Sequence, residues 1–278
     1  MELEIAPLLE TLGNPNRLAV FRLLMRRYPQ AVPAGEIARA LELKPSTLSV
    51  YLGALRQAGL IEQRREGTSL LYRPDMTRSA AMIQALWGDC CRGRPDLCPP
   101  PLLQHGDKTM TPARPYNVLF ICTGNSARSI FAEALLRDLG GEKFVAHSAG
   151  TQPYSELNPV AVQMLAEKGH DTALLRSKNV TEFQGESAPP LDFVFTVCDR
   201  AANETCPPWP GQPISGHWGL PDPVKVEGTQ AEKRLAFQQA YGLLKNRIQA
   251  FTALPFEGLD RISLQARIDD IALDGTPA

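Results

Sequence analysis

The sequence predicts two domains, a mostly α-helical one followed by a three-layer α/β one with a parallel sheet. Its 278 residues are too many for one small domain and fit two. Apolar residues recur at helical spacing in the first part, whereas strand-length apolar runs alternate with helical patterns from residue 116 onward. Prolines interrupt both patterns between residues 92 and 115. We therefore expect a first domain at 1–98, a Pro-rich linker at 99–115, an α/β domain at 116–252 and a tail at 253–278.

The composition, with 44% hydrophobic and 21% charged residues, is that of a soluble globular protein. A net charge of −1 gives no overall field that attracts nucleic acid, so any DNA contact must come from a local basic patch. The acidic N-terminus does not resemble a signal peptide, and no apolar run approaches the roughly 18 residues that span a membrane. These features predict a cytoplasmic protein without a membrane partner, whose 6 cysteines are catalytic or ligating rather than disulfide-bonded.

The first domain is expected to begin with helices. Asn14 and Pro15 form a helix-start signal, and the apolar side chains that follow share one helix face. A short helix at 35–41 and a turn at 42–44 come next. The sequence therefore predicts two helices that lead into a turn.

A second helix at 45–58 and a hairpin at 61–73 follow this turn. The helix carries a narrow apolar stripe made of Leu48, Leu52 and Leu55. The hairpin is basic and has Glu66-Gly67 at its tip. Helix, turn, helix and basic hairpin are the plan of a winged helix-turn-helix.

Six side chains of this motif are candidates for DNA contact. Small and polar groups on the second helix suit base edges and phosphates, and arginines on the wing suit phosphates. The candidates are Thr47, Ser49, Tyr51, Arg56, Arg64 and Arg65. A solvated helix face with a basic surface loop is the alternative interpretation.

Two segments of this domain resemble a known family. L-G-N-P-N-R-L-A-V-F-R-L-L at 12–24 and P-S-T-L-S-V-Y-L-G-A-L-R-Q-A-G-L-I at 45–61 are similar to the ArsR/SmtB metal-responsive repressors. The resemblance covers about residues 5–98. It implies a homodimer that leaves its operator DNA when metal or metalloid binds.

A cluster of three cysteines lies near the end of this domain. The stretch D-C-C-R-G-R-P-D-L-C at 89–98 resembles family members whose arsenite site is a Cys-Cys pair with a third Cys beyond the last helix. Three soft thiolates, from Cys90, Cys91 and Cys98, suit three-coordinate As(III) or Sb(III) better than zinc. Three unrelated thiols near a domain joint are the alternative.

The most informative segment of the second half reads C-T-G-N-S-A-R-S at 122–129. It follows an apolar run and precedes a helical stretch, so a thiol, a turn and an arginine meet at a strand-to-helix junction. Backbone amides there can face a tetrahedral anion, and the Arg128 guanidinium can bind two of its oxygens. The same field should favour thiolate at Cys122. A buried structural cysteine is the plainer alternative, and the convergence of thiol, loop and arginine argues against it. The predicted oxyanion-binding residues are Thr123, Gly124, Asn125, Ser126, Ala127 and Ser129.

The elements around this segment alternate. We predict strands at 117–122, 144–148 and 192–197 and helices at 130–139, 159–168 and 230–251. Such alternation calls for a parallel sheet covered on both faces, with the anion-binding loop at the carboxyl end of its first strand.

Four motifs carry a resemblance over about residues 116–252. They are V-L-F-I-C-T-G-N-S-A-R-S at 118–129, H-S-A-G-T at 147–151, T-V-C-D at 196–199 and G-H-W-G-L-P-D-P at 216–223. They resemble the low-molecular-weight protein tyrosine phosphatase fold and, within it, the thiol-dependent arsenate reductases. The resemblance implies that Cys122 attacks the central atom of a bound oxyanion without an organic cofactor. It also implies that Arg128 and the loop amides hold the charge and that Asp222 protonates the leaving oxygen. An Asp-Pro turn without a catalytic role is the alternative at Asp222.

Two further cysteines favour reduction over phosphate hydrolysis. Cys198 follows a predicted strand and should lie at the same sheet edge as Cys122, and Cys206 follows in a Pro-rich loop. The resemblance implies that Cys198 attacks first and that a Cys198–Cys206 disulfide is then reduced by thioredoxin. Glutathione with glutaredoxin, or another low-molecular-weight thiol, is the alternative reductant.

The resemblance also implies a cation site. Some relatives hold a potassium ion near the anion loop, and three residues match its ligand positions. These are Asn125, Glu133 and Ser148.

Taken together, the sequence predicts an arsenic-response protein that joins an arsenite-responsive repressor to an arsenate reductase. A phosphatase fused to a regulatory module is one alternative. A DNA-binding sensor whose second half only binds oxyanion is another.

Overall fold

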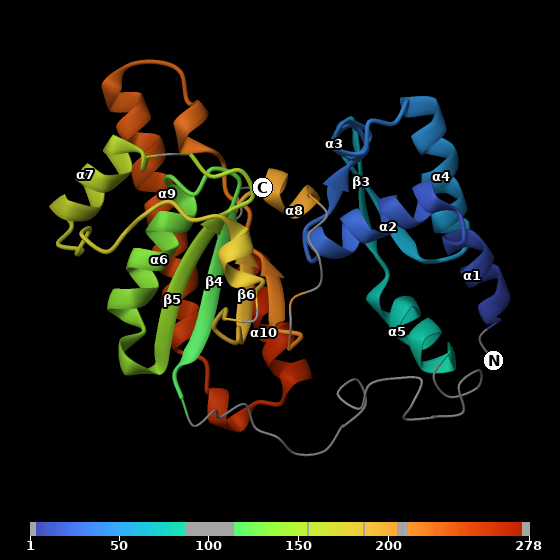
Figure 1. Cartoon of the computed structure of the whole chain (residues 1–278). Coiled ribbons are helices and arrows are strands. Elements are labelled where there is room, and N and C mark those ends of the chain that lie inside the picture. Colours follow the sequence, from blue (N-terminus) through green and yellow to red (C-terminus); the bar gives the residue numbers. More distant parts are fainter. Residues whose placement is uncertain are drawn as a thin grey trace. The chain divides into compact units, whose positions relative to one another are not determined.

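The computed structural model describes residues 4–86, 114–154, 156–185, 187–204, 209 and 211–273. The chain divides into two compact units, Met1–Asp107 and Lys108–Ala278, each with its own hydrophobic core (Figure 1). The predictions for Cys90, Cys91, Cys98 and Cys206 lie outside the described residues.

The first unit is a winged helix-turn-helix, as predicted. Its helices are α1 (Ile5–Leu12), α2 (Pro15–Arg27), α3 (Ala34–Ala40), α4 (Pro45–Gln57) and α5 (Met76–Ala85). The strands β1 (Val32–Pro33), β2 (Ile61–Glu66) and β3 (Ser69–Pro74) form an antiparallel sheet in the order β1-β3-β2. Asn14 caps α2 by accepting hydrogen bonds from the amides of Asn16 and Arg17. The predicted stripe of α4, made of Leu48, Leu52 and Leu55, is buried in the core of this unit.

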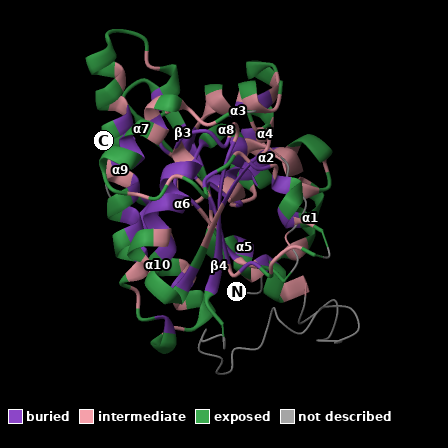
Figure 2. Ribbon diagram, turned by 60° about the vertical axis from the view of Figure 1, so that its left-hand side comes forward, coloured by how far each residue is buried: buried purple, intermediate pink, exposed green. Residues whose placement is uncertain are grey.

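The second unit contains a parallel sheet of four strands in the order β5-β4-β6-β7. Its strands are β4 (Tyr116–Cys122), β5 (Phe144–Gly150), β6 (Phe193–Thr196) and β7 (Ile214–His217). β4 is buried along its whole length (Figure 2), as expected for an inner strand that is covered on both faces. Cys122 is the last residue of β4. It therefore lies at the edge formed by the carboxyl ends of the strands, on an inner strand of the sheet.

Helices surround this sheet. They are α6 (Arg128–Leu139), α7 (Pro159–Glu167), α8 (Asp199–Asn203), α9 (Gln230–Thr252) and α10 (Arg261–Leu273). Short 3-10 turns lie at Gly141–Lys143, Val180–Phe183, Pro223–Lys225 and Phe256–Gly258. Phe251 of α9 meets Phe193 and Phe195 edge-to-face at centroid distances of 5.2 and 5.3 Å. Such pairs fix the orientation of α9 against the sheet.

The C-terminal segment is part of the second unit. The sequence predicted only a tail at 253–278 beyond the α/β domain. In the structure, Leu264, Ile268 and Ile271 of α10 are buried in the core, and α10 contacts β7 and α9. Gln265 donates a 2.9 Å hydrogen bond to the carbonyl of Ser215 in β7. Because β7 is an edge strand, this helix covers backbone groups that an open edge would expose.

Within the described part of the chain, none of the helices is long and apolar enough to cross a membrane.

Removing part of the α10 contact should destabilise the second unit. We expect Leu264→Ala, at a fully buried position, to lower the free energy of unfolding by about 2–5 kcal/mol, because it leaves a cavity. Urea unfolding followed by tryptophan fluorescence measures this, with Leu273→Ala, at an exposed position of the same helix, as the control. Equal stabilities of the two variants would show that α10 does not pack as described.

Candidate active site

The anion loop, residues 123–127, joins β4 to α6. Asn125 has a left-handed backbone with φ of 43°, an uncommon conformation for a residue other than glycine. A Cβ atom at Gly150 of the neighbouring strand would lie 2.6 Å from the carbonyl oxygen of Thr123, so only glycine fits there. The loop is therefore held in a tight turn against β5. It contains the predicted oxyanion-binding residues Thr123, Gly124, Asn125, Ser126 and Ala127, and Ser129 follows in the first turn of α6.

The Cys122 thiol accepts hydrogen bonds from the start of the loop and from α6. The amide of Asn125 donates to Sγ at 3.1 Å, and Ser129 Oγ lies 2.9 Å from Sγ. Asn125 Nδ2 donates to Ser129 Oγ at 2.9 Å, which leaves the Ser129 hydroxyl hydrogen for the sulfur. Both contacts stabilise a thiolate.

Burial nevertheless raises the pKa of Cys122 above its ordinary value, and the nearby Cys198 raises it further. The hydrogen bond from Ser129 and the charge of Arg128 lower the pKa of Cys122 but do not outweigh burial. The local field therefore acts in favour of thiolate, as expected, but burial outweighs it in the site without a ligand. The reason is that a fully buried sulfur loses its hydration.

Arg128 connects the loop to the predicted general acid. Its Nη2 lies 2.8 Å from Asp222 Oδ2, and its Nη1 donates to the carbonyl of Leu220 at 3.0 Å. Asp222 also accepts from the amide of Val224 at 3.2 Å. The structure thus brings together Cys122, Arg128 and Asp222, which are far apart in the sequence.

The segment that carries Asp222, residues 218–223, is tied to the last two helices. Arg247 of α9 donates to the carbonyls of Gly219 at 3.3 Å and Ala272 at 3.1 Å. The indole of Trp218 donates to the carbonyl of Ile268 at 3.4 Å. Arg247 was not predicted, because an arginine on a long helix has no local signal that it will be buried.

Cys198 lies at the same sheet edge as Cys122, as predicted. It lies two residues beyond the end of β6, and its Sγ is 3.5 Å from the hydroxyl of Thr123 in the anion loop. The amide of Ala201 donates to Cys198 Sγ at 3.4 Å. Cys122 and Cys198 are both buried free thiols. A second sulfur therefore lies beside the loop that holds the first.

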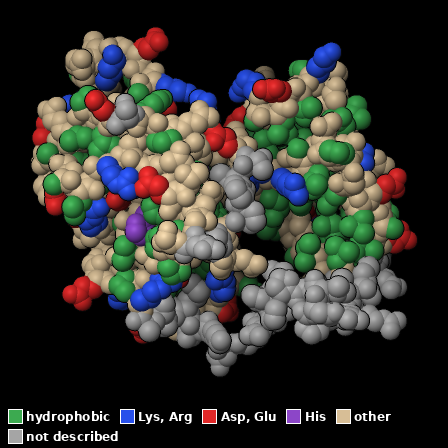
Figure 3. Space-filling view, viewed as in Figure 1, with side chains coloured by type: hydrophobic (Ala, Val, Ile, Leu, Met, Phe, Trp, Pro, Cys, Tyr) green, Lys and Arg blue, Asp and Glu red, His purple; other side chains and the backbone are tan. Residues whose placement is uncertain are grey.

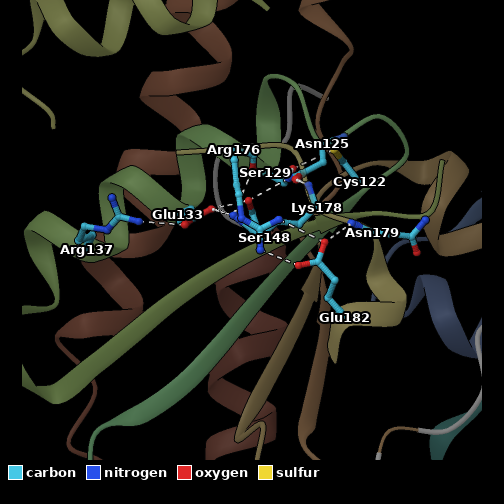
Figure 4. Close-up of polar contacts among 10 residues, drawn as sticks. All are labelled: Cys122, Asn125, Ser129, Glu133, Arg137, Ser148, Arg176, Lys178, Asn179 and Glu182. Atoms are coloured by element: carbon cyan, nitrogen blue, oxygen red, sulfur yellow. Dashed lines mark hydrogen bonds and ion pairs between the residues drawn. The ribbon is translucent and has the colours of Figure 1, made fainter. Parts of the chain in front are cut away.

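A polar network lies behind the anion loop (Figure 4). Asn125 Nδ2 donates to Ser148 Oγ at 2.8 Å, and Ser148 donates to Glu133. Lys178 Nζ donates to the same Glu133 oxygen at 2.9 Å, and Arg137 binds the other oxygen at 2.9 Å. The potassium-ligand positions expected from the resemblance, Asn125, Glu133 and Ser148, are thus joined to one another. Lys178 was not predicted, because it lies in a stretch without helical or strand periodicity.

The DNA-binding candidates lie on α4 and the wing of the first unit. Ser49 is exposed and Thr47 half-buried, while the Tyr51 hydroxyl accepts a 3.1 Å hydrogen bond from Asn16. Arg56 donates to Gln63 at 3.2 Å.

The two wing arginines have local partners. Arg64 contacts Glu66 at 3.4 Å with 66% of its side chain exposed, and Arg65 donates to the carbonyl of Gly67 at 3.1 Å. Basic and acidic side chains are interspersed on the face that Figure 3 shows.

The Ser129 hydroxyl should control the acidity of Cys122. We expect Ser129→Ala to raise the pKa of Cys122, since the variant loses a hydrogen bond that favours the charged form. At a fixed pH below that pKa, alkylation of Cys122 by iodoacetamide should become slower, and its rate profile should move to higher pH. The exposed Ser215→Ala is a matched control, and an unchanged profile in Ser129→Ala would contradict the assigned hydrogen bond.

Two family models match the chain. Residues 117–262 match the low molecular weight phosphotyrosine protein phosphatase family, and residues 12–64 match a helix-turn-helix domain. Among curated relatives, an arsenate reductase of Oceanobacillus iheyensis is 34% identical over 134 residues, which are 48% of this chain and 93% of the relative. An arsenate reductase of Bacillus subtilis is 35% identical with the same coverage. Among solved structures, the transcriptional repressor BigR from Xylella fastidiosa is 33% identical, covers 30% of this chain and 83% of its own, and has a TM-score of 0.26.

The phosphatase-family match includes the anion loop, Cys198 and Asp222, and it covers more than half of the chain. The relatives of this chain that are named arsenate reductases align with it over almost their whole length. The chain belongs to the low molecular weight phosphotyrosine protein phosphatase family and joins an arsenate-reductase-like member of it to a helix-turn-helix regulator domain.

Proposed function

We propose that the second unit reduces arsenate to arsenite and that the first unit is a repressor that arsenite releases from DNA. The observation that carries the first part is the position of Cys198, whose sulfur is 3.5 Å from Thr123 of the anion loop. A phosphatase of this fold needs only water to hydrolyse its phosphocysteine, whereas a reductase needs a second thiol within reach of the first. The relatives named arsenate reductases support the same conclusion.

The first step joins sulfur to arsenic. As arsenate enters the loop, the Cys122 proton passes to an oxygen of the bound anion, and the thiolate attacks arsenic. The arriving oxyanion takes hydrogen bonds from Arg128 and so competes with Asp222, which is 2.8 Å away. The Asp222 carboxylate now lies beside the bound anion, takes up a proton from one of its As–OH groups and delivers this proton to the leaving hydroxyl, which departs as water.

The second step transfers two electrons. Cys198 sulfur attacks Cys122 Sγ, an S–S bond forms while the S–As bond breaks, and the electron pair of that bond reduces As(V) to As(III). Arsenite leaves. Cys206 then attacks Cys198 to form the Cys198–Cys206 disulfide and to free Cys122. An external thiol, thioredoxin or glutathione with glutaredoxin, restores both thiols.

The proposed repressor works as a homodimer. Its recognition helix is α4, with the arginines of the wing on phosphates, and its arsenite site consists of Cys90, Cys91 and Cys98. The product of the second unit is then the effector of the first. A cytoplasmic location follows from these two roles.

Turnover should depend on both buried thiols. We expect Cys122→Ser to abolish arsenate reduction, and Cys198→Ser to allow at most one arsenic adduct per chain because nothing reduces that adduct. The measurement is arsenate-dependent NADPH oxidation with thioredoxin and thioredoxin reductase, repeated with glutathione and glutaredoxin. Sustained turnover by Cys198→Ser would exclude the relay.

The same samples distinguish a phosphatase. Hydrolysis of p-nitrophenyl phosphate that is indifferent to Cys198→Ser, without NADPH consumption under either thiol system, would make the second unit a phosphatase. Arsenate-dependent NADPH oxidation that is lost in both variants supports the reductase.

Arsenite release should depend on the cysteine cluster of the first unit. We expect Cys91→Ser to bind the DNA upstream of its own gene as tightly as the native chain does but to stay bound when arsenite is added, because two thiolates hold As(III) less tightly than three. Fluorescence anisotropy of labelled DNA measures both properties. Cys122→Ser is the matched control and should still release DNA; release of Cys91→Ser by arsenite would place the effector site elsewhere.

A further inference from the structure

The polar network behind the anion loop contains a buried ammonium group. Lys178 is 7% exposed, and its Nζ donates to Glu133 Oε2 at 2.9 Å and to the carbonyl of Arg176 at 3.2 Å. A carboxylate oxygen and a backbone carbonyl are the oxygen ligands that hard cations take in proteins. The Lys178 ammonium therefore occupies the position where oxygen ligands of a metal cation would converge (Figure 4).

The groups expected to bind potassium are occupied by contacts within the protein. Asn125 Oδ1 accepts from the backbone amide of Lys178 at 2.7 Å, and Asn125 Nδ2 donates to both Ser129 and Ser148. Ser148 Oγ accepts from Asn125 and donates to Glu133. The oxygens of both side chains therefore already have hydrogen-bond partners within the protein.

The charges lead to the same conclusion. The carboxylate of Glu133 is 4% exposed and already has two cations, Lys178 on one oxygen and Arg137 on the other. The nearby Glu182 contacts Arg176 on the protein surface. A further cation in this network would meet two positive groups and a single carboxylate, with little water to screen them. The described residues therefore do not fit a potassium site.

We propose that Lys178 replaces the potassium ion of such sites, so that this protein organises its anion loop independently of potassium. The ammonium fixes Glu133, which orients Ser148. Ser148 orients the Asn125 amide, and this amide holds both the left-handed turn of the loop and the Ser129 hydroxyl on Cys122. Lys178 is thus a positioning residue for the oxyanion site. The inference depends on that site but not on arsenate reduction, so it can be tested even if the proposed reaction is wrong.

The first test uses the native chain. Binding of inorganic phosphate is measured by isothermal titration calorimetry, and the melting temperature by differential scanning calorimetry, in potassium, sodium and choline chloride at equal ionic strength. We expect the same phosphate affinity and the same melting temperature in potassium and sodium. Stabilisation or tighter binding specific to potassium would overturn the proposal. This measurement needs no variant.

The second test removes the internal cation. We expect Lys178→Ser to weaken phosphate binding in sodium or choline chloride by roughly tenfold or more, because a buried carboxylate loses a charge partner. Potassium should recover a large part of this affinity, since the substitution opens a space beside Glu133. Lys178→Arg should keep the affinity and remain indifferent to potassium.

Arg137→Ser is the matched control, because it removes the same charge from the same carboxylate but leaves Lys178 in place. We expect it to bind phosphate without a preference for potassium. A potassium response in Arg137→Ser equal to that in Lys178→Ser, or unchanged phosphate affinity in Lys178→Ser, would contradict the role given to Lys178. If Lys178→Ser does not fold, the comparison of potassium with sodium decides, measured on the native chain and on Lys178→Arg.

Discussion

The site depends on the conformation of Asn125. Its backbone takes the left-handed turn that brings the loop between β4 and α6 around Cys122, and its fully buried side chain uses all of its hydrogen-bonding groups. A left-handed residue other than glycine costs on the order of 1 kcal/mol or more, and such strain persists only where the surroundings fix it. Here the contacts to Ser129, Ser148 and Lys178 hold the strained residue in place.

The parallel sheet explains why residues far apart in the sequence meet. Every strand of the second unit points the same way, so the residues that follow β4, β6 and β7 emerge at one edge. Cys122 is the last residue of β4, whereas Cys198 follows β6 and Asp222 follows β7. Burial at this edge has two opposite effects on Cys122: it keeps water from the sulfur, but it also raises the pKa of the thiol and so disfavours the thiolate. A site that attacks with a buried thiol must therefore move its proton as the substrate binds.

Sequence patterns predicted the elements with strong periodicity and the motifs within them. The buried run of β4, the capped α2 and the stripe of α4 were predicted within a few residues, because each has a local signal. β7 was missed, since four residues that include glycine do not form a recognisable strand pattern.

Lys178 and Arg247 were missed for another reason. Both are charged residues that become buried only through partners distant in the sequence. Composition and spacing predict that most charged residues are exposed. They do not predict which charged residues are buried by tertiary contacts.

The position of α10 has a consequence for biosynthesis. The segment that carries Asp222 is held by Trp218 and Arg247, which bond to carbonyls of α10, the last helix among the described residues. Domains of a growing chain fold as they leave the ribosome, N-terminal ones first. The helix-turn-helix unit is complete long before the ribosome has made α10, whereas the oxyanion site can form fully only after it. Each newly made molecule thus has a folded helix-turn-helix unit before it has a complete oxyanion site.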